Sequence, residues 1–229
     1  MKPLWTQTSS DMDHRFSSGG FAKAGGNHQS LAFAVAAFSR VLTESPVAKV
    51  LHELAGYRIE PLENGDNMIH GTKSIIYDYG CALGDGTAYI KSIFPMARVV
   101  GVDISPMATQ IAAQRWPFCE FYPGDIQKPY QIDYSIIYTS HTLEHLENPA
   151  ETVRGLLART SILIAVVPPI PEVRSKGDSS HVGAVPIQRW LDELEEPIYT
   201  ESYNTLRPDG ESGGVILEGN LLLVWRGKQ

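Results

Sequence analysis

The chain has 229 residues, of which 43% are hydrophobic and 20% charged, and its net charge is -7 at pH 7. This composition is typical of a globular protein, and the negative balance argues against a nucleic-acid partner. The N-terminus lacks the apolar core of a signal peptide, and no apolar run reaches the roughly 18 residues of a membrane span. Cys81 and Cys119 form no metal-binding spacing and no disulfide framework. We therefore expect a cytoplasmic protein that does not bind membranes.

The first 56 residues are predicted to form an N-terminal arm with two helices. Residues 1–30 are polar and rich in glycine, which is typical of a mobile arm, and Phe16 lies in it as a candidate lid residue. An alternative role for the arm is a contact between two copies, so a homodimer is left open. Apolar residues at helical spacing predict one helix over 31–42, and a second is expected to begin at Pro46 and end at Gly56.

From residue 74 onward, apolar strands alternate with helical patterns. The strands are expected over 74–80, 97–105, 119–125, 134–140 and 161–169, with helices over 85–94, 105–116 and 149–160. Strands this apolar are buried on both faces, as in a parallel sheet covered by helices. A helix over 187–196 and two strands over 198–206 and 215–227 follow. The pattern predicts a doubly wound, Rossmann-like α/β fold over 57–229, with a mostly parallel seven-stranded sheet and an antiparallel last strand.

A glycine-rich stretch, IIYDYGCALGDGTAYI at 75–90, joins the first of these strands to its helix. Gly80, Gly84 and Gly86 permit a tight turn and the close approach of a ligand at the carboxyl end of the strand. By themselves they fit a plain turn equally well. Asp103 ends the next strand, where an acid can accept hydrogen bonds from both hydroxyls of a ribose. Its alternative role is to cap the helix that begins at Pro106.

Two nucleoside cofactors fit this pattern: a nicotinamide dinucleotide and S-adenosylmethionine (SAM). Asp78 precedes Gly80 by two positions. A carboxylate there would repel a pyrophosphate, whereas it suits the cationic amino group of SAM. The sequence also lacks the Tyr-x-x-x-Lys pair of short-chain dehydrogenases. The residues thus favour SAM, with a nicotinamide-dependent oxidoreductase as the alternative.

Four motifs in order make the chain resemble the class I SAM-dependent methyltransferases that act on small molecules, over residues 72–226. The motifs are DYGCALGDGT, in which Ala82 replaces a commoner glycine, then VVGVDIS, FYPGDI and IDYSIIYTSHTLEHLENP. In the third, the resemblance implies that Asp125 faces the adenine amino group and Ile126 packs on the ring; a turn aspartate is the alternative. The cofactor-binding residues implied are Asp78, Gly80, Cys81, Ala82, Gly84, Gly86, Asp103, Ile104, Asp125, Ile126, Ser140 and His141.

The fourth motif also supplies the candidate catalytic residues. Methyl transfer to a hydroxyl requires removal of its proton, and a neutral histidine is the natural base near pH 7. His141 is the first candidate because it follows a strand end, and His145 is the second. The alternative is a structural role for both. The expected reaction is methyl transfer to a hydroxyl oxygen of a small molecule, such as a sugar or a specialised metabolite; a non-catalytic SAM-binding module is a further alternative.

A divalent metal is a less favoured possibility. Some relatives that methylate hydroxyls hold a metal through a Glu-x-x-Glu-His pattern and a distant histidine. This chain has His141, Glu144 and His145 at the corresponding positions, with His181 further on. A histidine in place of the first glutamate disfavours Mg²⁺ and leaves only a transition metal as a candidate.

Overall fold

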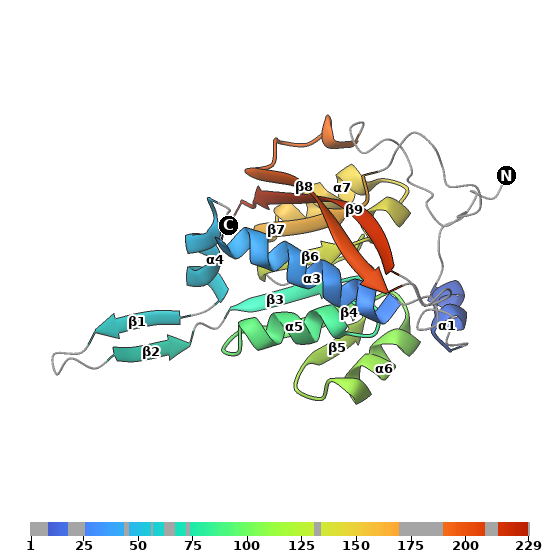
Figure 1. Cartoon of the computed structure of the whole chain (residues 1–229), viewed down its shortest axis with the longest axis horizontal. Helices are drawn as coiled ribbons and strands as arrows, with labels where there is room; N and C mark the ends of the chain where they lie inside the picture. The colour runs from blue at the N-terminus through green and yellow to red at the C-terminus, as the bar shows by residue number, and fades with distance from the viewer. Residues whose placement is uncertain are drawn as a thin grey trace.

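The computed structural model describes residues 9–17, 26–43, 46–55, 57–61, 67–71, 74–130, 134–169, 190–208 and 215–228. The helices are α1 (Ser9–Ser17), α3 (Gly26–Thr43), α4 (Ala48–Ala55), α5 (Asp85–Ile93), α6 (Pro106–Arg115), the 3-10 helix η1 (Leu143–His145) and α7 (Pro149–Leu157). The strands are β1 (Tyr57–Pro61), β2 (Asn67–Gly71), β3 (Ile75–Tyr79), β4 (Arg98–Asp103), β5 (Glu120–Pro123), β6 (Tyr134–Ser140), β7 (Thr160–Val167), β8 (Tyr199–Pro208) and β9 (Val215–Arg226). Figure 1 shows their arrangement.

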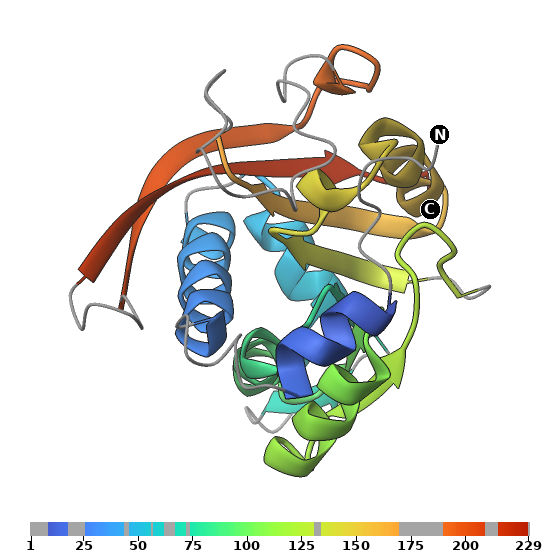
Figure 2. The ribbon, with the colours of Figure 1, turned by 90° about the vertical axis from the view of Figure 1, so that its right-hand side faces the viewer.

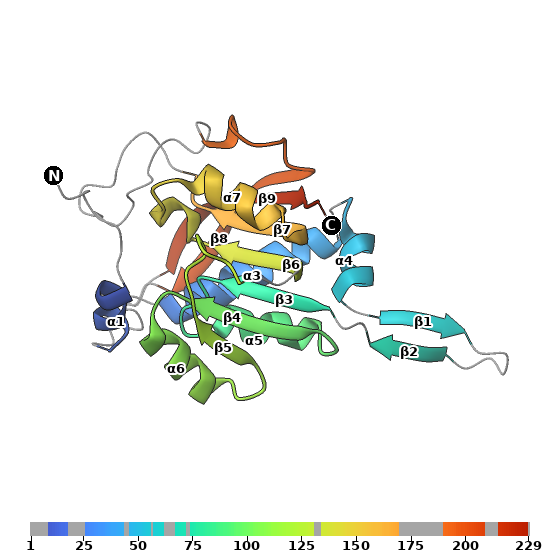
Figure 3. The same ribbon diagram turned by 180° about the vertical axis from the view of Figure 1, so that it is seen from behind.

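Seven strands form one sheet in the order β5-β4-β3-β6-β7-β9-β8. The pairs from β5 to β7 are parallel, and β9 runs antiparallel to both β7 and β8. This confirms the predicted fold class. The parallel strands β4 and β6 point toward the end of the molecule where α1 lies, and the hairpin β1–β2 projects at the opposite end (Figure 3). The carboxyl ends of the parallel strands, where such sheets bind ligands, therefore lie on the side of α1.

Helices pack on both faces of this sheet. On one face, α3, α4 and α5 share an apolar core with alternate side chains of β3, β4, β6 and β7; Phe38, Leu51 and Ile90 are fully buried in it. On the other face, α7 packs through Val153 and Leu156 against a second core that includes Trp190 and Trp225. Among the described helices, none is by itself long and apolar enough to cross a membrane; α3 and α4 qualify only as a pair bent by 109°.

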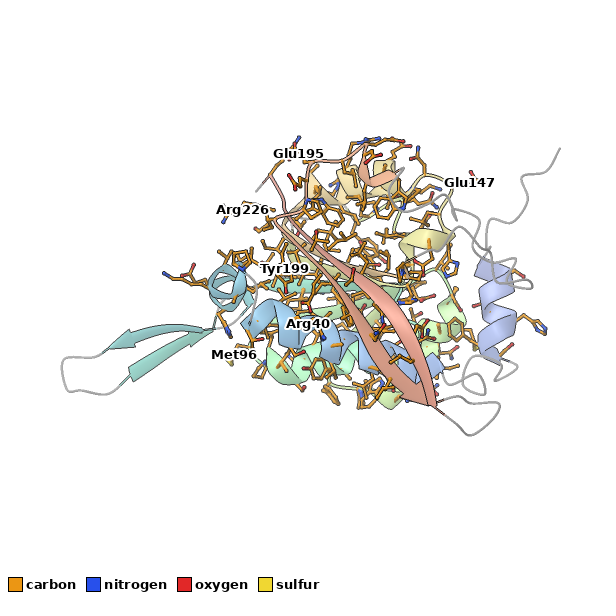
Figure 4. The ribbon with its side chains drawn as sticks, turned by 45° about the horizontal axis from the view of Figure 1, so that its top comes forward. Arg40, Met96, Glu147, Glu195, Tyr199 and Arg226 are labelled. Atoms are coloured by element: carbon orange, nitrogen blue, oxygen red, sulfur yellow. The ribbon has the colours of Figure 1, made fainter. Side chains whose placement is uncertain are left out.

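Helix α3 is fixed across β8 by a polar contact as well as by its apolar side. Arg40 donates from Nε to Glu201 Oε1 at 2.9 Å, and its guanidinium lies 4.2 Å from the centre of the Tyr203 ring. Tyr199 donates to the other oxygen of Glu201 at 2.6 Å. Figure 4 shows Arg40 and Tyr199 close together on this face. The contact sets the position of α3, whose N-terminal half reaches the carboxyl ends of the strands.

Residues 9–17 differ from the mobile arm that the sequence predicts for residues 1–30. They form α1, and Gly26–Ser30 belong to α3. The cause is tertiary: Phe16 is only 5% exposed and packs in an apolar cluster with Leu83 and Ala108. Helices α3 and α4 are likewise part of the main core. A lid function for residues 1–56 stays a prediction, as does the division of the chain at residue 56.

Two further elements correct the sequence-based expectations. The hairpin of β1 and β2 precedes the first predicted strand, and the Asn64-Gly65 dipeptide between its strands is the signal that would have revealed it. The helix predicted over 187–196 does not extend beyond Leu191 in the part that the structure describes. Asp192, three glutamates and Pro197 follow within the next six residues. Acidic side chains in the last turn of a helix are unfavourable, and the Glu195 carbonyl instead accepts from Trp225 Nε1 at 2.9 Å.

Candidate cofactor and acceptor site

The turn after β3 is built on two glycines in the left-handed region, Gly80 with φ +81° and Gly84 with φ +82°. The backbone N–H groups of Gly80 and Cys81 both donate to the Val102 carbonyl, at 2.7 and 3.1 Å, which ties the turn to β4. A Cβ atom on Gly80 would overlap Thr142 Oγ1, and one on Gly84 would lie 2.6 Å from the Phe121 ring. These two glycines are thus required by the packing of the chain itself.

Gly86, in the first turn of α5, lies near two other elements. A Cβ atom there would be 3.4 Å from the Ser30 carbonyl of α3 and 3.5 Å from Asp78 Oδ2. Ala82, in the turn, adopts φ +48°, a conformation that favours glycine, in agreement with the commoner glycine at this position of the motif. The direct approach of a ligand to these backbone positions stays a prediction.

Asp103 fastens the turn to the start of α6. Its Oδ2 accepts from the Ala82 N–H and its Oδ1 from the Ser105 N–H, both at 2.9 Å. Ser105, and not Asp103, caps the helix, because its Oγ accepts from the Ala108 N–H at 3.1 Å. Burial raises the pKa of Asp103 to about 6, and the two backbone hydrogen bonds oppose this shift. Each carboxylate oxygen keeps a further lone pair for a ligand hydroxyl.

Asp78 is buried at the end of β3, beside the start of α5. Its Oδ2 accepts from Thr87 Oγ1 at 2.6 Å. Burial raises the pKa of Asp78 to about 7; the Thr87 hydrogen bond opposes the shift, and the charge of Asp103 adds to it. A cation bound next to this carboxylate would restore its ionisation, so the residue fits the ammonium group of SAM.

Helix α1 lies against the start of α6 (Figure 2). Asp13 Oδ1 accepts from the Met107 N–H at 3.1 Å and from the Ser105 hydroxyl in a short hydrogen bond. Phe16 packs in a cluster that includes Ala82 of the turn. Sequence reasoning did not find Asp13, because no local signal links it to residues more than 90 positions away.

Three predicted cofactor-binding residues follow β4 and β5, and two of them, Asp125 and Ile126, are predicted to meet the adenine. Asp125 Oδ1 accepts from the Gln127 N–H at 2.9 Å, so it stabilises a turn, as the alternative interpretation proposed. Ile126 is buried in the second core, and Ile104 is half-buried. Contacts of Asp125 and Ile126 with an adenine ring stay predictions, as does cofactor binding by Ile104, and a turn role for Asp125 is compatible with them.

His141 lies at the carboxyl end of β6, directly after Ser140. Its φ is +49°, its ring stacks on Phe33 of α3 with 3.9 Å between the ring centres, and its Nε2 is 2.8 Å from Asn220 Oδ1 of β9. Its Nδ1 is 3.6 Å from Glu144 Oε1. Strained residues of this kind cluster at functional sites. Sequence reasoning found His141 but neither Phe33 nor Asn220, which come from distant segments.

His145 ends η1 and is half-buried. Within the described residues, no group of three or more His, Cys, Asp or Glu side chains is arranged to hold a metal ion. His181, the distant member of the predicted metal set, lies outside those residues. His141 Nδ1 and Glu144 Oε1, 3.6 Å apart, form a histidine–carboxylate contact.

Comparison with known proteins assigns the family. A model of a methyltransferase domain family matches residues 44–167, more than half of the chain. The chain belongs to the class I SAM-dependent methyltransferases. SAM is thus its cofactor, and the nicotinamide alternative is set aside. The buried acids Asp78 and Asp103 at neighbouring strand ends fit the cationic and hydroxyl groups of SAM.

Among curated relatives, this methyltransferase is 32% identical to the trans-aconitate 2-methyltransferase of Klebsiella pneumoniae over 89 residues, covering 38% of this chain and 35% of that protein. It is 32% identical to the enzyme of that name from Escherichia coli O157:H7 over 100 residues, covering 43% and 36%. The matched segment spans only about a third of these relatives.

Among solved structures, a methyltransferase from Bacillus halodurans has a TM-score of 0.57 at 16% identity, covering 79% of this chain and 98% of that one. The plantazolicin methyltransferase BpumL, solved with S-adenosylhomocysteine (SAH) and a pentazolic desmethylPZN analogue, has a TM-score of 0.54 at 16% identity, covering 93% and 91%. At this identity the two structures support the fold.

Proposed function

We propose that the protein transfers the methyl group of SAM to an oxygen atom of a small molecule. SAM supplies an electrophilic methyl group on a sulfonium. The observation that carries the proposal is the meeting of two sets of residues at one edge of the sheet. Asp78 and Asp103 end the adjacent strands β3 and β4, and His141 follows β6, which neighbours β3 on its other side.

The first set forms the cofactor half of the site. Asp78 would pair with the ammonium group, Asp103 would accept from the ribose hydroxyls, and Asp125 and Ile126 would meet the adenine. Two buried carboxylates with raised pKa values favour a cationic ligand, because the ligand charge offsets the cost of keeping them ionised. The Phe16 side of α1 would cover this half and exclude water.

The second set, with His141 at its centre, forms the acceptor half. Its work is to place an oxygen within about 3 Å of the methyl group, in line with the carbon–sulfur bond. A hydroxyl acceptor requires a base, for which His141 is the candidate and His145 the second. A carboxylate acceptor requires none. The relatives named above carry trans-aconitate, an acid, in their names, which supports including carboxylates among the acceptors tested.

Isothermal titration with SAH and, separately, NADH tests the cofactor half. SAH is expected to bind at micromolar concentration and NADH not to bind. Asp103→Ala should weaken SAH binding tenfold or more, about 1.5–3 kcal/mol for lost hydrogen bonds to a charged group. Because Asp103 also holds Ala82 and Ser105, the unfolding midpoint of the variant is measured alongside. Glu53→Ala, at an exposed position of α4, is the control.

Transfer of a labelled methyl group to a panel of acids and alcohols then tests the reaction and separates an enzyme from a non-catalytic SAM-binding module. Binding of NADH in place of SAH, or of neither ligand, would contradict the proposal. Nucleic acid serves as a negative control, and gel filtration determines whether the chain forms a homodimer.

A further inference from the structure

Asn220 occupies a fixed place beside the candidate base. It is 1% exposed, on β9, and its Nδ2 donates to Thr205 Oγ1 and to the Glu218 carbonyl, each at 3.0 Å. A backbone carbonyl can only accept a hydrogen bond, so the end of the side chain that faces Glu218 is the NH₂ group. The oxygen Oδ1 is therefore the end that faces His141.

This orientation assigns the proton on His141. Oδ1 can only accept, and it lies 2.8 Å from His141 Nε2, so Nε2 must carry the hydrogen and donate it. Both the neutral Nε2–H form and the doubly protonated form satisfy this contact. In neither does Nε2 have a lone pair with which to accept a proton from an acceptor.

The other sides of the ring are also occupied. Nδ1 faces Glu144 Oε1 at 3.6 Å, and one ring face is covered by Phe33, with the two rings only 3° from parallel. The side chain of His141 is 15% exposed. Glu144 is itself buried, so the nitrogen that could hold a lone pair is directed toward an interior carboxylate.

We propose that Asn220 is a positioning residue that keeps the Nε2 proton on His141, and that the acceptor is consequently a small molecule whose reacting oxygen is already ionised, a carboxylate. This inference rests on the proposed methyl transfer. A carboxylate has a pKa near 4 in water and arrives deprotonated at pH 7. Its oxygen forms the new bond to the methyl carbon, the carbon–sulfur bond breaks with its electron pair left on sulfur, and a methyl ester results. No proton moves, so no base is needed.

A hydroxyl acceptor would place the opposite demand on the site. The loss of a positioned base typically lowers the rate 10²- to 10⁴-fold, and the alcohol would meet a histidine that already donates from Nε2. Turning the ring to expose another edge would break two contacts, the stack on Phe33 and the hydrogen bond of Nε2 to Asn220. Asn220 thus favours carboxylate over hydroxyl acceptors through its hydrogen bond to His141, and it need not touch the acceptor itself.

The test of the proton assignment uses the full chain labelled with [¹⁵N]histidine and observed by imidazole ¹H–¹⁵N correlation spectra, with the His141 signals assigned from His141→Gln. In the wild type we expect the pattern of a protonated Nε2. Asn220→Asp retains an acceptor oxygen and should preserve that pattern, whereas Asn220→Leu should shift the neutral population toward Nδ1–H. Asn204→Ala, at an exposed asparagine on β8, should change nothing. Because the wild-type spectrum decides the assignment, the test survives a variant that fails to fold.

The test of the acceptor class compares carboxylic acids with matched alcohols, in which CH₂OH replaces the carboxylate, using labelled SAM and the wild-type protein. Acids are expected to be methylated at least 10²-fold faster. A neutral Nδ1–H tautomer with a bare Nε2 would overturn the inference, as would alcohols that react as fast as the acids. Failure to bind SAH would instead refute the proposed function while leaving the imidazole spectra as they are, so the two failures are distinguishable.

Discussion

The cofactor half and the acceptor half of the site are assembled in different ways. Around the glycine turn, partners are close in sequence: Asp103 bonds Ala82 across 21 positions, and Asp78 bonds Thr87 across nine. Around His141, the partners are Phe33 on α3 and Asn220 on β9, the latter 79 positions away. A motif can encode the first arrangement because β3, α5 and β4, which follow one another along the chain, contain it. The second depends on the packing of three distant segments.

Gly80→Ala should have the largest effect, because Gly80 is where the two halves touch. The new Cβ atom would overlap Thr142 Oγ1, and the alanine backbone would have to adopt φ +81°. We expect a loss of about 2–4 kcal/mol in the free energy of unfolding, from overpacking and backbone strain together. Urea denaturation followed by circular dichroism measures it.

Gly155→Ala is the matched control for this substitution. It lies in α7 with nothing within 4 Å of a new Cβ, so it should be neutral or stabilise by up to about 1 kcal/mol. A second variant, Gly80→Ala with Thr142→Ala, should recover part of the loss. Equal stability of Gly80→Ala and Gly155→Ala would show that the two halves do not constrain each other at this point.

Asp78→Asn should raise the free energy of unfolding while weakening the binding of SAH to the cofactor half. The pKa of Asp78 is about 7 in the folded protein and near 3.8 in the unfolded chain, so the folded state binds the proton more tightly. The free energy of unfolding therefore falls as the pH rises from about 4 to 7 and is constant above that. Asn removes this penalty, and the variant should be more stable than the wild type at pH 8, by about 1–3 kcal/mol.

The comparison of Asp78→Asn with the wild type requires unfolding curves at pH 5 and pH 8, and SAH titrations at pH 8. The gain in stability should be larger at pH 8, while SAH binding is weakened because the partner of the ammonium group is lost. Asp103 contributes in the same direction over pH 4 to 6 and remains in both proteins. A variant that is less stable than the wild type at pH 8 would contradict the assigned burial cost.

Asp13→Ala tests a distant contribution to the cofactor half. Asp13 links α1 to the start of α6, so its loss should cost about 0.5–2 kcal/mol, as for other helix caps, and speed the release of SAH several-fold. Stopped-flow fluorescence measures that rate. Ser17→Ala, on the same helix, removes only a local bond to the His14 carbonyl and should leave the rate unchanged. Equal rates in both variants would rule out α1 as a cover for the cofactor.

Ala82→Gly should have the smallest effect. Glycine relieves the strain of φ +48°, worth about 1–2 kcal/mol, but it also loses the packing of a methyl group near Phe16 and adds freedom to the unfolded chain. We expect a net change within about 1 kcal/mol and little change in SAH affinity. Thermal unfolding and titration would reveal a larger loss, which would mean that the Ala82 methyl group anchors α1.

Sequence-based prediction succeeded where the contacts are close in sequence and failed where they join distant segments. The order of strands and helices from β3 to β7, the start of α6 at Pro106 and the acids at the ends of β3 and β4 could be predicted, because periodicity and turn chemistry are local. Helix α1 could not be predicted, because Asp13 and Phe16 contact α6 and the turn, which are distant in sequence. The hairpin carries a local sequence signal, the Asn64-Gly65 dipeptide.

By itself, the sequence determined the class of fold, the preference for SAM over a nicotinamide dinucleotide and the position of His141 at a strand end, because each follows from residues within a few turns or strands of one another. It could not determine how that histidine is protonated. Only the tertiary structure placed β9 between β7 and β8, and with it the oxygen of Asn220 against Nε2. Proton placement depends on the nearest acceptor in space, and here that acceptor lies on another strand.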